Sequence, residues 1–150
     1  MFRILIVDDD FAMRASLRTL LVWEDYGCEI VGEATNGEAA MAFLKKNEAD
    51  VVITDMSMPV MSGVELIRLV RQYWPEIQII ALSGYADFGY VRESLKYGAR
   101  DYLLKHQLTA PSLLEVLQSA LAQIHQNLQQ RRHYETSKRI LRQEFIRDML

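Results

Sequence analysis

Hydrophobic and polar residues follow two different periods along the first 105 residues. Short runs of consecutive apolar residues, of strand length, alternate with longer stretches in which apolar residues recur every three or four positions, as in an amphipathic helix. The runs predict strands at residues 3–7, 29–34, 50–56, 77–82 and 101–104. The stretches between them predict helices at residues 11–23, 38–46, 62–73 and 87–97. This regular alternation predicts an α/β fold.

The third run, Asp50-Val51-Val52-Ile53-Thr54-Asp55-Met56, is β-branched, almost entirely apolar and ended by a carboxylate. A strand that is apolar on both faces is typical of the interior of a parallel sheet. Right-handed crossovers then predict a doubly wound, five-stranded parallel sheet with helices on both faces. Asp55 would lie at the carboxyl end of a central strand, the edge at which open α/β sheets bind ligands.

Polar side chains follow four of the predicted strands. Asp8 and Asp9 follow the first strand, Asp55 ends the third, Ser83 follows the fourth and Lys105 the fifth. Because the carboxyl ends of parallel strands share one edge, these side chains should converge. Three clustered carboxylates raise one another's pKa unless a cation neutralises them, and hard oxygen ligands suit Mg²⁺. The sequence therefore predicts a magnesium site.

The chemistry that needs these groups together is phosphoryl transfer. Asp55 can act as a nucleophile to form an acyl phosphate, while Mg²⁺ and Lys105 stabilise the charge on the phosphoryl oxygens and Ser83 donates to one of them. Neither GxGxxG nor GxxxxGK[ST] follows any strand, which argues against a nucleotide-binding version of this architecture.

Five separated motifs resemble the signature of the response-regulator receiver domain of two-component signalling, over about residues 1–125. They are Ile4-Leu5-Ile6-Val7-Asp8-Asp9-Asp10, Asp55-Met56-Ser57-Met58-Pro59, Gly63, Ala81-Leu82-Ser83-Gly84 and Asp101-Tyr102-Leu103-Leu104-Lys105. The resemblance implies that Asp55 is the phosphoacceptor and, with Asp9, a direct magnesium ligand. It implies that Asp8 acts through bound water and that the backbone carbonyl of Ser57 is a further ligand.

The same resemblance implies a switch formed by Ser83 and Tyr102, in which the hydroxyl moves toward the phosphoryl group and the ring follows it inward. The change would alter the face made by the fourth helix, fifth strand and fifth helix. The resemblance also suggests that Ser57 and Tyr85 flank the attack path. The implied partners are a sensor histidine kinase and a second copy, joined through that face or through the C-terminal helix.

The local sequence of these motifs is most similar to that of YesN-like regulators, which carry an AraC-type helix-turn-helix output domain. We therefore expect transcriptional output, with DNA bound only through a domain that would follow residue 150. In one respect the sequence departs from the family pattern, because His106 stands where proline usually follows the lysine. A cis bond before a residue other than proline costs about 3 kcal/mol, so we expect either a trans bond with an adjusted loop or a strained cis bond.

Two alternatives differ in kind. A small metal-dependent phosphohydrolase of the haloacid-dehalogenase type also uses an aspartate nucleophile, placed after the first strand with a second aspartate two residues on, as Asp8 and Asp10 are. The later acidic motifs of that class are missing. The other alternative is a receiver-like interaction module that is never phosphorylated, which the departure at His106 would favour. The preferred interpretation is a switch that modifies itself, not an enzyme.

Composition and charge limit the partners and the cellular compartment that we expect for this protein. A net charge of −3 and a pI near 5.6 argue against a nucleic-acid footprint along the whole chain. Cys28 is the single cysteine, so neither a disulfide nor a cysteine zinc site is available, as is usual in a reducing compartment. No run approaches the ~20 apolar residues that span a bilayer. We expect a cytoplasmic protein that does not associate with membranes.

Beyond the fifth strand, Ser112 and Glu115 have the spacing of a capping box for a helix that no proline or glycine stops before Leu150. We assign residues 1–125 to the receiver domain and 126–150 to a helical linker. Arg131 falls on the apolar seam of that helix and interrupts a strict heptad. Two interpretations stay open for the linker: a dimeric coiled coil with an interruption, or a solvated segment that frays near its end.

Overall fold

The fold is a five-stranded parallel sheet covered by helices on both faces, as predicted from the sequence. The computed structural model describes residues 1–84 and 88–149. The strands lie in the order β2-β1-β3-β4-β5, and every neighbouring pair is parallel. The strands are β1 Phe2–Val7, β2 Cys28–Ala34, β3 Val51–Asp55, β4 Gln78–Ser83 and β5 Asp101–Leu104. The helices are α1 Phe11–Leu20, α2 Gly37–Lys46, α3 Gly63–Tyr73, α4 Phe88–Tyr97 and α5 Ala110–Met149.

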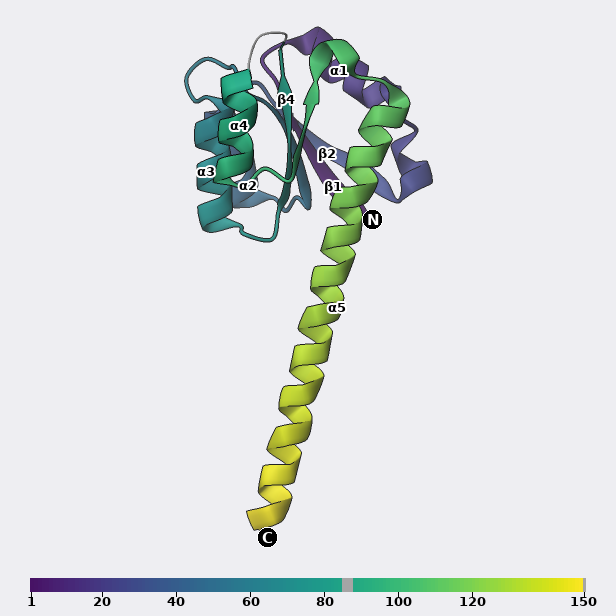
Figure 1. Ribbon diagram of the computed structural model, residues 1–150, viewed down its shortest axis with the longest axis vertical. Helices are drawn as coiled ribbons and strands as arrows, with labels where there is room; N and C mark the ends of the chain where they lie inside the picture. Colours follow the sequence, from purple (N-terminus) through teal and green to yellow (C-terminus); the bar gives the residue numbers. More distant parts are fainter. Residues whose placement is uncertain (85–87, 150) are drawn as a thin grey trace.

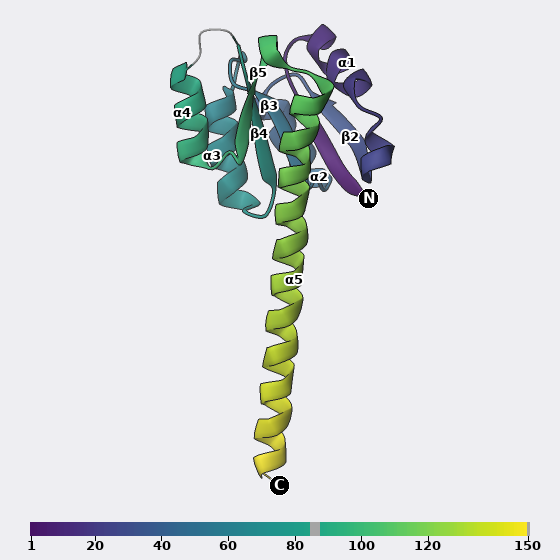
Figure 2. The same cartoon turned by 45° about the vertical axis from the view of Figure 1, so that its right-hand side comes forward.

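Each face of the sheet has its own hydrophobic core, because successive side chains of a strand point to opposite faces. Leu5, Val52 and Ile79 pack in one core with residues of α2 and α3. Ile4 and Ile53 pack in the other core with residues of α1 and the first turns of α5. Figures 1 and 2 show the resulting three layers, with α1 and α5 on one side of the sheet and α2 and α3 on the other.

Local sequence explains most helix starts. Asp10 accepts a hydrogen bond from Ala12 N at the start of α1, and Ser62 accepts one from Glu65 N at the start of α3. The predicted helix at residues 87–97 is observed from Phe88, while its first residue lies outside the described part of the chain.

Two helix boundaries differ from the prediction. The first helix ends at Leu20 instead of Trp23, because Trp23 begins a separate 3₁₀ turn and its buried indole N–H donates to the Leu17 carbonyl. The last helix begins at Ala110, before the predicted cap at Ser112. Thr109 and Ser112 form a reciprocal pair instead, in which each backbone N–H donates to the other's hydroxyl.

The last helix is 40 residues long, and its second half extends away from the sheet (Figures 1 and 2). It passes residue 125 without a break. Large apolar side chains are exposed along the projecting part, namely Leu128, Tyr134, Ile140, Leu141, Phe145 and Ile146. Among the described helices, none is both long and apolar enough to cross a membrane.

Candidate functional site

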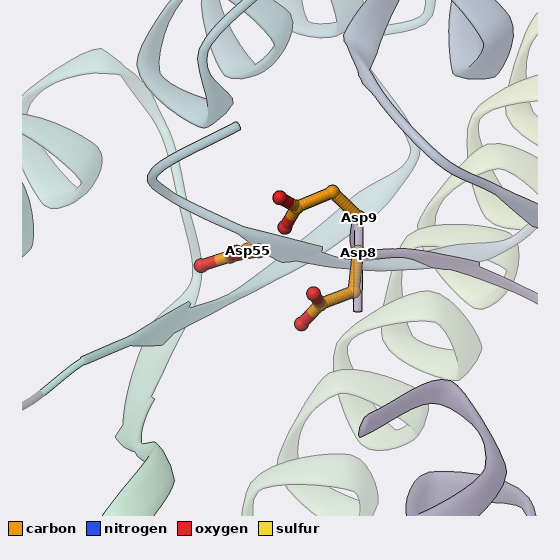
Figure 3. A group of neighbouring side chains, drawn as sticks. All are labelled: Asp8, Asp9 and Asp55. Atoms are coloured by element: carbon orange, nitrogen blue, oxygen red, sulfur yellow. The ribbon is translucent and has the colours of Figure 1, made fainter. Parts of the chain in front are cut away.

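Three aspartates meet at the carboxyl edge of the sheet. Asp55 is the last residue of β3, and Asp8 and Asp9 follow β1, which is hydrogen-bonded to β3. One carboxylate oxygen from each of the three lies within 4.8 Å of the others. Figure 3 shows the three side chains close together, with Asp8 and Asp9 adjacent on the chain. Asp8 and Asp55 are buried, whereas Asp9 is exposed, so the cluster has one side open to solvent.

Lys105 completes the cluster from the far end of the sheet. Its Nζ lies 2.9 Å from Oδ2 of Asp8 and 3.2 Å from Oδ2 of Asp55. The Lys105–His106 peptide bond is trans, and residues 105–107 form a short 3₁₀ turn directly after β5. The trans bond with an adjusted loop is therefore the observed alternative. The ammonium reaches the carboxylates although no proline follows it.

Burial dominates the electrostatics of Asp55. It raises the pKa of the Asp55 carboxyl above its ordinary value, and the negative charge of Asp8 raises that pKa further. Lys105 and the Ser57 N–H, which lies 3.4 Å from Oδ1 of Asp55, act in the opposite direction without cancelling the rise. Burial also lowers the pKa of Lys105, but the two carboxylates outweigh it, so the pKa of Lys105 is raised and it remains a cation. The site holds more negative charge than its one ammonium neutralises.

The donor set suits a hard divalent cation. Oδ1 of Asp8 accepts a hydrogen bond from Asp10 N at 2.9 Å, but the fully buried Oδ2 accepts none from the described residues. That oxygen lies 2.9 Å from the Lys105 ammonium, with which it forms an ion pair. Carboxylate oxygens with a free lone pair, gathered beside solvent, are what Mg²⁺ binds while keeping several waters. The side chain of Asp10 caps α1 instead. It therefore does not play the part of the second catalytic aspartate that the phosphohydrolase alternative requires.

The two switch residues occupy different environments. Ser83 ends β4 next to Asp55's strand, is fully buried, and its Oγ lies 3.5 Å from the Gly84 carbonyl. Tyr102 lies on β5 and is 38% exposed. The proposed flanking residue Ser57 is exposed beside Asp55, while Tyr85 lies outside the described residues.

Two residues, Gly63 and Arg14, help to hold the site in place, and the sequence analysis assigned neither of them this structural role. Gly63 opens α3 so close to the end of β3 that a Cβ there would lie 2.2 Å from the Asp55 carbonyl oxygen. Arg14 on α1 donates from Nη1 to the Asp8 carbonyl at 2.6 Å and forms an ion pair with Glu33 at 3.0 Å. The glycine belongs to the quoted motifs and could have been found there, whereas no pattern in the sequence indicated the arginine.

Comparison with known proteins decides the family. Residues 4–118 match the response regulator receiver domain family. The chain belongs to that family. It is therefore a receiver domain of a two-component response regulator. Receiver domains are signalling switches and not classical enzymes.

Several curated proteins similar to this receiver domain are named as transcriptional regulatory proteins. It is 38% identical over 120 residues to the transcriptional regulatory protein YesN of Bacillus subtilis, an alignment that covers 78% of this chain and 33% of YesN. It is 35% identical over 115 residues to DegU of Brevibacillus brevis, covering 77% of this chain and 48% of that protein. The chain thus spans about a third to a half of the length of these relatives.

A solved structure agrees with the fold. The receiver domain of AraT, a response regulator from Geobacillus stearothermophilus, superposes with a TM-score of 0.77 at 32% identity, covering 85% of this chain and 98% of that one. A two-component transcriptional regulator AraC from Clostridium phytofermentans gives the same TM-score at 28% identity.

Proposed function

We propose that this receiver domain accepts a phosphoryl group on Asp55 from a sensor histidine kinase, in a reaction that requires Mg²⁺. The observation that carries the proposal is the meeting of Asp8, Asp9 and Asp55 at one edge, with the Lys105 ammonium 3.2 Å from the acceptor carboxylate. Asp9 and Asp55 would bind the ion directly, Asp8 through water, and Ser57 through its backbone carbonyl. The bound ion would supply positive charge to the phosphoryl oxygens.

The chain's own groups have distinct tasks in this transfer. A carboxylate oxygen of Asp55 forms the new bond to phosphorus, while the bond from phosphorus to the donor breaks and the leaving group takes that bond's electron pair. Lys105 contacts an equatorial oxygen of the phosphoryl group, and the Ser83 hydroxyl donates to another. Because Asp8 and its surroundings are buried, the local dielectric constant is low and these charges interact strongly.

Phosphorylation then changes a surface. The added group brings about two negative charges, and a two-state element needs only a few kcal/mol of bias to change its population. Ser83 moves toward the phosphoryl group, and Tyr102, which is exposed in this structure, moves inward behind it. The altered face is the one formed by α4, β5 and α5.

We further propose that this change serves transcription in the cytoplasm. The curated relatives named above are transcriptional regulators two to three times as long as the matched region. DNA binding would belong to an output domain outside this chain, of AraC type. Pairing of two copies, through the altered face or through α5, would pass the signal on.

Incubation with acetyl phosphate tests the acceptor. With Mg²⁺ present, intact-protein mass spectrometry should show a gain of one phosphoryl group per chain, and chelation of the metal should abolish it. The Asp55→Asn variant should gain nothing, while the matched Asp101→Asn variant, changed at an aspartate remote from the cluster, should be labelled like the wild type. Stoichiometric labelling of Asp55→Asn would overturn the assignment, and sustained turnover of a generic phosphomonoester would favour the phosphohydrolase.

A further inference from the structure

Asp9 is the exposed member of the aspartate cluster, and the backbone holds it in place. Among the described residues, no side chain binds the Asp9 carboxylate by a hydrogen bond or an ion pair. Its buried neighbour Asp8 is held on two sides. The Asp8 N–H donates to the Ala34 carbonyl at 3.0 Å, and Oδ1 of Asp8 accepts from Asp10 N at 2.9 Å. The orientation of Asp9 therefore depends on the peptide unit that joins it to Asp8 (Figure 3).

Arg14 holds that peptide unit. The Asp8 carbonyl and the Asp9 N–H lie in one rigid plane, so a contact that fixes the carbonyl also orients the Cα of Asp9. Nη1 of Arg14 donates to this carbonyl at 2.6 Å. The Arg14 side chain is 12% exposed, so little water competes for the contact. Because Arg14 belongs to α1, the hydrogen bond ties the loop after β1 to the helix that follows it.

A carboxylate on the neighbouring strand holds the guanidinium in turn. Nε of Arg14 lies 3.0 Å from Oε1 of Glu33 on β2, and Nε of Arg18, one helical turn further on, lies 2.7 Å from Oε2. Contacts with these arginines, that of Arg18 first, lower the pKa of Glu33, so Glu33 is an anion at neutral pH. The rigid fork of a guanidinium can donate to the carbonyl and to the carboxylate at once, which a lysine ammonium on its flexible stem does poorly.

We propose that Arg14 is a positioning residue for the divalent cation. By holding the peptide between Asp8 and Asp9, it keeps the Asp9 carboxylate beside Asp55 and so raises the affinity of the cluster for Mg²⁺. The proposal rests on the magnesium site of the proposed function and not on phosphoryl transfer. Groups that orient metal ligands through a hydrogen bond typically contribute about ten- to a hundredfold to metal affinity.

Charge alone predicts the opposite effect. Arg14 is a cation next to the cluster and repels a divalent cation, so its removal would strengthen Mg²⁺ binding if charge were its whole contribution. A positioning role predicts that its removal weakens binding, so the sign of the change separates the two. Arg18 provides the matched control, because it has the same charge and contacts the same Glu33 carboxylate, while its ion pair among the described residues is with Glu33 and not with the cluster.

Isothermal titration calorimetry with MgCl₂ measures the affinity. Arg14→Met should weaken Mg²⁺ binding about tenfold or more, whereas Arg18→Met should bind at least as tightly as the wild type. Arg14→Lys keeps the charge but loses the fork, and its affinity should lie between those of Arg14→Met and the wild type. Glu33→Gln should weaken binding in the wild type and much less in Arg14→Met, because Glu33 acts through the guanidinium.

Backbone NMR relaxation in EDTA tests the positioning without any metal. The order parameter of the Asp9 amide should be close to about 0.85 in the wild type, as in rigid backbone, and should fall toward about 0.6 in Arg14→Met. It should not change in Arg18→Met. Amides of β3 should keep their wild-type values in both variants, which shows that the sheet remains folded.

The possible failures are distinguishable. Mg²⁺ binding by Arg14→Met as tight as that of the wild type, an equal loss in Arg18→Met, or an Asp9 amide that stays rigid in Arg14→Met would each overturn this proposal and leave the magnesium site intact. A wild type that binds no Mg²⁺ would overturn the magnesium site together with this proposal. Protein that shows the predicted Mg²⁺ affinities but gains no phosphoryl group would contradict the proposed function alone.

Discussion

Replacement of Asp55 by asparagine should make the metal-free protein more stable. The change removes one buried negative charge and keeps the size of the side chain. With an effective dielectric constant of about 20, the repulsion from Asp8 within 4.8 Å is about 3.5 kcal/mol and the attraction to Lys105 at 3.2 Å is about 5 kcal/mol. The difference of about 2 kcal/mol is smaller than the several kcal/mol that burial costs an ion. Burial therefore decides the sign, in agreement with the raised pKa of Asp55.

The size of the effect follows from the linkage of protonation to folding. Each unit by which the folded pKa exceeds the unfolded value costs the wild type about 1.4 kcal/mol at neutral pH. We expect Asp55→Asn to raise the free energy of unfolding by on the order of 1 kcal/mol and Tm by about 3 °C. Because the folded pKa is the higher one, the native state binds more protons. The advantage of the variant should be complete above the folded pKa and should vanish as pH falls toward 3.8.

Urea unfolding in EDTA at pH 7 measures this difference, and added Mg²⁺ should reverse it. Ion at 100 times its dissociation constant stabilises the wild type by about 2.7 kcal/mol and the variant by much less. Asp9→Asn is the matched control: its exposed side chain should change stability in EDTA by no more than about 0.5 kcal/mol, while the gain from Mg²⁺ is lost. An Asp55→Asn protein less stable than the wild type in EDTA would refute the reasoning.

Three further substitutions test the supports of the site. Lys105→Met leaves two buried carboxylates without their ammonium and should lower the free energy of unfolding in EDTA by about 2 kcal/mol, as measured by urea titration. Added Mg²⁺ should reduce this loss. Gly63→Ala places a Cβ against the backbone at the end of β3 and should lower the free energy of unfolding by about 3 kcal/mol or more, as measured by thermal unfolding. The control Gly89→Ala, which has open space around it, should leave that free energy unchanged. Val60 has a φ of 71°, so Val60→Gly should stabilise by about 1 kcal/mol, whereas Val22→Gly at a φ of −85° should destabilise; equal effects would contradict the strain argument.

The sequence predicted the sheet and the cluster because both depend on strand ends. Runs of apolar residues mark where parallel strands stop, and the rule that their carboxyl ends share an edge brings Asp8, Asp55 and Lys105 together without coordinates. Helix boundaries were harder. Trp23 is buried in the core through a 3₁₀ turn, which is a matter of tertiary packing. At the start of α5, Thr109 and Ser112 offered two local capping arrangements, between which the sequence did not decide.

Features set by three-dimensional packing could not be read from the chain. Arg14 reaches the Asp8 carbonyl only because α1 packs beside the end of β2, where Glu33 holds the same guanidinium. The trans bond at Lys105 was one of two alternatives until the turn after β5 was seen.

Direct mapping of the phosphorylated residue tests the central claim. After incubation with acetyl phosphate and Mg²⁺, borohydride reduction converts an aspartyl phosphate to homoserine, and peptide mass spectrometry locates the product. Homoserine should be found at position 55 alone and only when Mg²⁺ was present. Homoserine at Asp8 or Asp9 instead, or an unmodified Asp55 in protein that had gained a phosphoryl group, would contradict the account.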